Sequence, residues 1–116
     1  MNIYDRAHEL ARALKESPEY QDYQRAKEIA MENETQKALI EEYKKLQFQL
    51  QISMAGGASP DPAELERLQK IAGVLQLSHE ATEYLMAEFR FQKMLSDIFK
   101  ILADVANIDL DSLTRS

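Results

Sequence analysis

The chain has 116 residues, no cysteine, and 20 acidic against 14 basic residues, which gives a formal net charge of −6. Lack of cysteine excludes disulfides, thiol catalysis and thiolate metal sites, and the acidity argues against nucleic-acid phosphates as direct ligands. The first residues do not form a signal peptide, and no apolar stretch is long enough to span a membrane. We therefore expect one cytoplasmic domain, residues 1–116, without membrane insertion.

Two of the three glycines and two of the three prolines lie in one segment, and this segment is the only strong loop signal in the chain. It predicts two helical halves, residues 1–54 and 62–108, joined by a Gly/Pro loop at 55–61. No hairpin signal and no run of alternating β-branched residues is present. The pattern predicts an all-α fold of about five helices, arranged as a long helical hairpin or bundle.

The first helix is predicted from Ile3 to about Glu16, capped by Asn2. Its apolar positions are expected to be buried; they are Ile3, Ala7, Leu10, Ala11 and Leu14. Ser17 followed by Pro18 then starts a second helix over roughly 18–31, because proline suits the first helical position.

Asn33 is predicted to cap a third helix that runs to about Met54. The second and third helices are either separate or one kinked rod. Four residues of the third helix step by four, three and four and form an apolar row: Leu39, Tyr43, Leu46 and Leu50.

Asp61 and Pro62 predict the start of a helix after the loop. Gly73 lies inside this helix, where it costs about 1 kcal/mol against alanine, and we interpret it as the site of a close helix crossing. Ser78 either caps a new helix or lies at a bend. The final helix is expected to end near Asn107, and residues 108–113 are compatible with one further turn.

Two overlapping apolar rows run along the final helix. They are Phe91, Leu95, Ile98, Leu102 and Val105, and Met94, Ile98, Ile101, Val105 and Ile108. Together they make an apolar face wider than an ordinary surface helix needs. This face is buried either inside a monomeric bundle or against another chain. We favour self-association, in which the row of Leu39, Tyr43, Leu46 and Leu50 is the candidate surface that meets it.

The sequence offers little catalytic chemistry. His8 and His79 each have a carboxylate nearby on the same helix face, but neither completes the ligand pattern of carboxylate-bridged metal bundles. Gly56 and Gly57 lack the Gly-Lys-Ser/Thr that a phosphate-binding loop requires. We predict no catalytic residue, no metal and no cofactor. A carboxylate-type metal protein remains an alternative.

A family resemblance is carried by residues 2–10 continuing to 17–20, by Gln47–Gln51, by the break at 56–62 with the amphipathic helix after it, and by the closing helix 86–106. Over these stretches, which cover nearly the whole chain, the sequence resembles the YlbF/YmcA-type family of small bacterial helical proteins, and most closely its YheA-like branch. The resemblance implies five helices built around long helices that pair as a homodimer.

Better-studied relatives of this type are similar to adaptor proteins, which assemble with homologous family members and with other proteins. They affect RNA processing by a membrane-anchored ribonuclease, competence, biofilm formation and sporulation. Some relatives carry iron–sulfur clusters on cysteines, which this chain lacks. We therefore expect a non-enzymatic, cytoplasmic interaction or adaptor protein. An RNA-processing accessory that contacts RNA directly is the second alternative.

Overall fold

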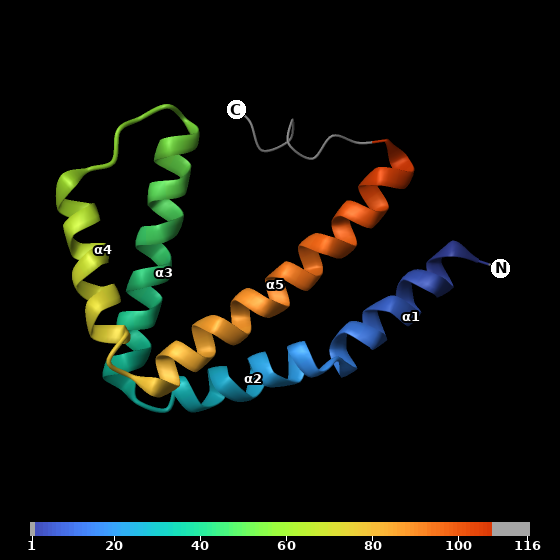
Figure 1. The fold of residues 1–116 in the computed structure, drawn as a ribbon, viewed down its shortest axis with the longest axis horizontal. Helices are drawn as coiled ribbons and strands as arrows, with labels where there is room; N and C mark the ends of the chain where they lie inside the picture. Colours follow the sequence, from blue (N-terminus) through green and yellow to red (C-terminus); the bar gives the residue numbers. More distant parts are fainter. Residues whose placement is uncertain (1, 108–116) are drawn as a thin grey trace.

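The computed structural model describes residues 2–107, which form five helices and, within this range, no strand (Figure 1). This confirms the all-α prediction. The helices are α1 (Ile3–Glu16), α2 (Pro18–Ala30), α3 (Glu34–Ala55), α4 (Pro62–Leu75) and α5 (His79–Ala106). The further turn predicted over 108–113, and Ile108 at the end of the predicted stripe, lie outside the described residues.

Every helix begins at a side chain that accepts a hydrogen bond from a backbone N–H two or three residues later. These caps are Asn2, Ser17, Asn33, Asp61 and Ser78. The cap at Asn33 makes α2 and α3 separate helices, and the cap at Ser78 makes α5 a new helix. Asn107, whose φ of 57° is left-handed, ends α5 as the sequence predicts.

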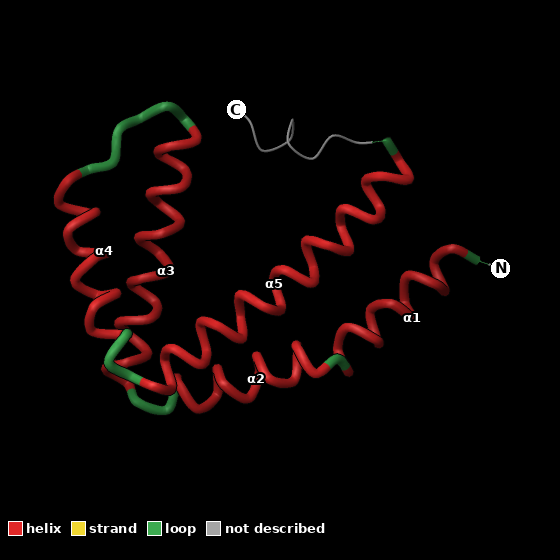
Figure 2. The backbone as a smooth tube through the Cα atoms, viewed as in Figure 1, coloured by secondary structure: helices red, strands yellow, loops and turns green. Residues whose placement is uncertain are grey.

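The helices form two arms that diverge from a common vertex (Figures 1 and 2). One, the hairpin arm, consists of α3 and α4 packed side by side. The other, the long arm, consists of α5 packed along α2, with α1 extending beyond α2. The molecule measures 52 × 37 × 16 Å. Its radius of gyration is 17.4 Å, whereas a compact chain of this length has about 13 Å. It is therefore an open, flat structure rather than a closed bundle.

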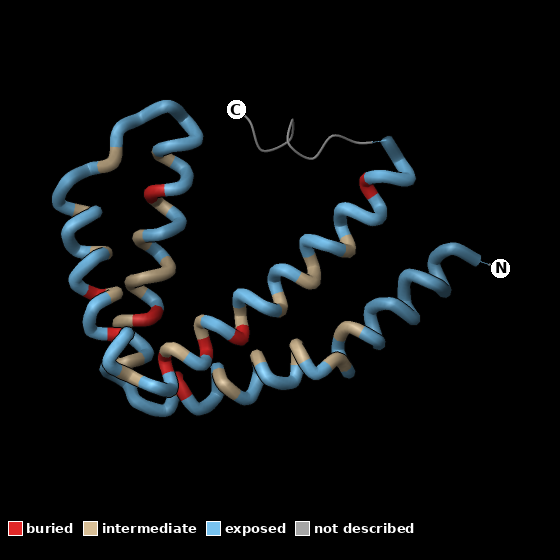
Figure 3. The backbone as a smooth tube through the Cα atoms, in the orientation of Figure 1, coloured by how far each residue is buried: buried red, intermediate tan, exposed pale blue. Residues whose placement is uncertain are grey.

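The hydrophobic core lies at the vertex, where the ends of α2, α3, α4 and α5 converge (Figure 3). Its largest fully buried side chains are Tyr84, Ile40 and Ile71. The smaller or less completely buried members of the same cluster are Ala30, Leu75 and Ala81. Farther along the hairpin arm, Arg67 donates two hydrogen bonds to the Glu42 carboxylate, at 2.8 and 2.9 Å, and thereby lowers its pKa.

Two expectations from the sequence are wrong for the isolated chain. No residue of α1 is buried, and Ile3 and Leu10 of its predicted buried face are 77% and 40% exposed. The reason is that α1 extends beyond the start of α2 and contacts mainly that helix end, so its apolar face has no long partner helix (Figure 1). Gly73 does not mark a close helix crossing either, because a Cβ atom added there would meet nothing within 4 Å.

The space around Gly73 gives a direct test of this correction. Gly73→Ala should raise the free energy of unfolding by about 1 kcal/mol, because alanine is the better helix former and no neighbour has to move. Urea unfolding at fixed protein concentration measures the change. The matched control is Gly57→Ala, which should destabilise the protein because Gly57 has a φ of +85°. A loss of stability in Gly73→Ala would instead support a close helix crossing.

Candidate functional site

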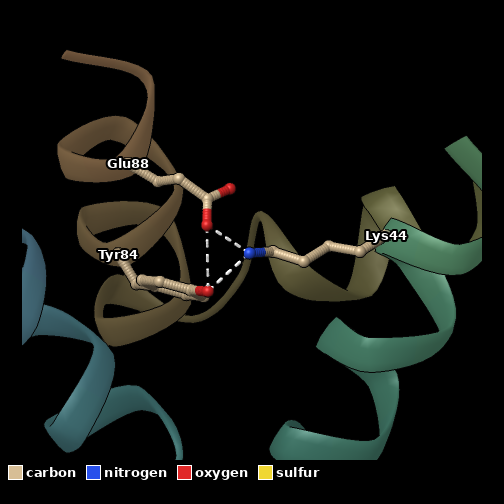
Figure 4. A network of polar contacts seen from close by, with 3 residues as sticks. All are labelled: Lys44, Tyr84 and Glu88. Carbon is tan, nitrogen blue, oxygen red and sulfur yellow. Dashed lines mark hydrogen bonds and ion pairs between the residues drawn. The ribbon is translucent and has the colours of Figure 1, made fainter. Parts of the chain in front are cut away.

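A polar network joins the two arms just above the vertex core (Figure 4). Lys44 on α3 donates hydrogen bonds to the Tyr84 hydroxyl and to the Glu88 carboxylate, both on α5. The Tyr84 hydroxyl in turn donates to Glu88 at 3.1 Å. Burial, followed by the negative charge of Glu88, raises the pKa of the Tyr84 hydroxyl far above its ordinary value. The hydroxyl therefore stays protonated and remains a donor.

Aromatic contacts fix the position of α2 on α5. The ring of Phe91 lies 5.2 Å from that of Tyr20 and 5.6 Å from that of Tyr23, and Tyr23 stacks on Tyr84 at 6.0 Å between centroids. Such pairs contribute about 0.5–1.5 kcal/mol each beyond the area they bury. Because Tyr20 lies in the first turn of α2, α5 beyond Phe91 extends past the start of that helix.

Above the polar network, the sides of the two arms that face each other carry no charged residue and include large apolar side chains. Phe48 and Ile52 follow Lys44 at four and eight residues, so they lie on the side of α3 that Lys44 turns towards α5. On α5, Leu95, Phe99 and Leu102 follow Glu88 on the side that it turns towards α3. We call these residues the inner faces. All of them except the half-buried Leu95 remain open to solvent: Phe48 is 63% and Phe99 61% exposed.

A second apolar side of α5 continues the face that Phe91 turns towards α2. Ile98 and Val105 follow Phe91 at intervals of seven residues, and Ile101 lies beside them. We call Ile98, Ile101 and Val105 the outer stripe. Because α1 diverges from α5 (Figure 1), the end of this stripe is uncovered, and Val105 is 88% exposed.

The structure distributes the interface residues predicted from the sequence over three environments. Leu50 is buried; Ile101, Leu102 and Val105 are exposed; and the half-buried residues are Leu39, Tyr43, Leu46, Phe91, Met94, Leu95 and Ile98. Leu39, Tyr43 and Leu46 pack against the vertex core. The chain therefore does not bring the predicted row on α3 against the stripe on α5. Their roles in an interface between chains stay a prediction.

The sequence-based prediction missed an informative segment at the end of the hairpin arm. Residues 46–60 contain no Asp, Glu, Lys or Arg. Most of the helical part of this segment is nevertheless accessible, including Ile52 at 56% and Met54 at 60% exposed. A helix end without charge on any side is unusual on a solvated surface and typical of an interface centre. The absence of charge was already readable in the sequence.

Elsewhere, a pocket of about 330 Å³ opens between α4 and α5. Its lining is mostly apolar, with Leu75, Met86 and Phe89 among the residues and Arg90 as the charged group. Among residues 2–107, no three His, Asp or Glu side chains gather where they could hold a metal ion. None of the described helices combines the length and apolarity that crossing a membrane requires.

Comparison with known proteins identifies relatives over nearly the whole chain. A family model described as "Control of competence regulator ComK, YlbF/YmcA" matches residues 3–105. The UPF0342 protein STH1710 of Symbiobacterium thermophilum is 37% identical over 108 residues, which are 93% of this chain and 96% of that protein. A UPF0342 protein of Caldicellulosiruptor bescii is 39% identical over 103 residues, 89% of this chain and 87% of that protein.

Two solved structures share the fold. A protein of unknown function (DUF964) from Bacillus stearothermophilus has a TM-score of 0.73 at 23% identity, covering 98% of this chain and 96% of that one. A chain of the crystal structure of Bacillus subtilis RicA in complex with RicF has a TM-score of 0.58 at 19% identity, and the match covers 90% of this chain and 94% of that chain. The finer placement in the YheA-like branch stays a prediction.

The polar network between the arms predicts the effect of removing its charge. Lys44→Met should lower the free energy of unfolding by about 2 kcal/mol, because the Glu88 carboxylate, 16% exposed, loses its cation. Tyr84→Phe should cost less, about 1 kcal/mol, since it removes one hydroxyl. Glu88→Gln alone should also destabilise the protein, and Lys44→Met/Glu88→Gln should lose less than the sum of these two single losses. Urea unfolding of the wild type, the single variants at positions 44 and 88 and their double variant measures the coupling; strictly additive losses would contradict a joint network.

Proposed function

Because the chain belongs to the YlbF/YmcA family, we propose that it is a non-enzymatic, cytoplasmic interaction module, an adaptor that self-associates and binds other proteins. The observation that carries this proposal is the exposure of large apolar side chains on both sides of the α5 end, including Phe99 and Val105. Burying each such side chain in an interface contributes about 1.5–3 kcal/mol before the cost of association.

The extent of exposed surface supports self-association. The chain has an accessible surface of 8896 Å², which is about 2,400 Å² more than the roughly 6,500 Å² expected for a compact chain of 13.4 kDa. A specific interface of standard size takes about 800 Å² from each partner. One chain therefore has enough surplus surface for an extensive interface and for a further partner.

The comparisons support a regulatory setting for these partners. The family model refers to control of a competence regulator, and one structural neighbour is a chain from the complex of RicA with RicF. We propose that this chain likewise binds proteins of its own family or others. A link to competence, RNA processing, biofilm formation or sporulation is part of the same proposal.

Self-association is tested by light scattering at micromolar concentration, which should give twice the chain mass of 13.4 kDa. Leu102→Glu should shift the protein towards the monomer with its helical circular dichroism retained, because Leu102 is already 55% exposed in the single chain. Leu77→Glu is the matched control: Leu77 is 88% exposed, lies outside the inner faces and the outer stripe, and should leave the dimer intact.

A wild-type protein that stays monomeric in this measurement would contradict self-association. Direct RNA contact is tested separately by fluorescence anisotropy with short RNAs. Because the chain is acidic, we expect no binding at low salt. Binding that weakens steeply as salt increases would favour the RNA alternative instead.

A further inference from the structure

We propose that two copies of this chain interlock, with the end of α5 from each copy lying between the two arms of the other. In this arrangement the inner faces of the two α5 helices meet across a two-fold axis. The charge-free end of α3, through Phe48 and Ile52, packs on the outer stripe of the partner's α5. The inference rests on the proposed self-association and specifies its surfaces.

The first argument is that α5 has two apolar sides where its own chain covers little. Beyond Phe91, its charged residues follow one another at spacings of three and four and share one side of the helix. They are Lys93, Asp97, Lys100 and Asp104. The inner face and the outer stripe occupy the other sides, and four of their members on α5 are 55% exposed or more: Phe99, Ile101, Leu102 and Val105. A helix that is apolar on two sides requires neighbours on both.

The second argument concerns the charge-free end of α3. Positions 48 and 50 of a helix differ by about 200°, so Phe48 lies opposite Leu50, which is 7% exposed. One side of α3 is therefore already packed, while Phe48 and Ile52 on the other side are exposed. Charged residues are depleted at the centres of protein interfaces. The absence of charge over 46–60 favours a protein neighbour on this open side.

The dimensions of the two segments agree. The charge-free helical part of α3, residues 46–55, is about 15 Å long, and α5 beyond Phe91 extends for about 22 Å. Phe48 and Phe99 of the inner faces are 63% and 61% exposed, so another helix reaches them without displacing a segment of the same chain.

Symmetry is the reason for choosing a second copy as the occupant. Both complementary surfaces, the end of α3 and the outer stripe of α5, belong to the same chain. A two-fold axis forms this contact twice and closes the assembly at two copies. No exposed apolar surface is then left that could bind further copies and form a fibre. The surplus of about 2,400 Å² per chain is large enough for the contacts between the two α5 helices and between α3 and α5.

Cysteine cross-linking tests this arrangement. Because the natural chain contains no cysteine, no other residue of the chain can form a competing disulfide. We expect an Ile52→Cys chain co-expressed with an Ile101→Cys chain to give a disulfide-linked heterodimer on oxidation. Peptide mass spectrometry should identify the bond between these two positions. The matched control replaces Ile52→Cys by Lys37→Cys, at an exposed position near the start of α3. The pair of Lys37→Cys and Ile101→Cys chains should give no more disulfide-linked product than a chain with one of these replacements expressed alone.

A charge placed on the open side of α3 tests the same contact in solution. Phe48→Glu should raise the dimer dissociation constant by at least about tenfold, because the charge is introduced twice in each dimer. The helical circular dichroism should be unchanged, since Phe48 is 63% exposed in the single chain. Leu77→Glu again serves as the control with the same type of replacement. Sedimentation equilibrium provides the measurement.

The outcomes separate this inference from the proposed function. A wild-type dimer that persists in Phe48→Glu and forms no bond between positions 52 and 101 overturns the interlocked arrangement and leaves self-association standing. A monomeric wild-type protein overturns both. In a third outcome, the wild-type protein is a monomer, and its inner faces become protected from hydrogen exchange only when a different protein binds. This outcome assigns the surface to that partner and rejects the second copy.

Discussion

The whole architecture depends on one small apolar cluster at the vertex, where four helix ends meet around Tyr84, Ile40 and Ile71. Helices that share a core along their length close into a bundle, whereas helices that share it only at their ends diverge. Beyond the vertex the chain supplies two separate pairings, α2 on α5 and α3 on α4. The apolar residues on the remaining helix sides have no partner of comparable length within the described chain.

The polar network directly above the core has a different role from the core itself. Apolar packing allows many relative orientations of two helices, whereas a cation held by both a carboxylate and a hydroxyl restricts where one helix lies against another. Lys44 is on one arm, and Tyr84 and Glu88 are on the other. The network therefore sets how far apart the inner faces lie at their base, and it separates the dry core from the exposed apolar surface above it.

Local structure could be predicted from the sequence because its causes are local. The caps at Asn2, Ser17, Asn33, Asp61 and Ser78 are short-range chemistry, and each one begins a helix. Whether a given helix side meets another helix could not be predicted in this way. Spacing shows that Ile3 and Leu10 share a side of α1, but it does not say whether another helix of the same chain reaches them.

The candidate site likewise has features that could be predicted from the sequence and features that could not. The width of the apolar surface on α5 was visible in the sequence, as was the absence of charge over 46–60 once the segment is considered as a surface. The pairing of Lys44 with Glu88 joins residues 44 positions apart and needed the tertiary structure. Within the chain, Leu39, Tyr43 and Leu46 pack against the vertex core, and their pairing with the α5 stripe of another chain stays a prediction.

The exposed side chains on the ends of both arms also bear on the life of the newly made chain in the cell. Until such surfaces are covered, they resemble those of an incompletely folded protein, which chaperones and proteases bind and which aggregates as its concentration rises. A chain without a partner is therefore at a disadvantage compared with an assembled one. In the proposed assembly, abundance would be coupled to assembly, and the amount of this protein would follow the supply of the partner that covers Phe48, Phe99 and Val105.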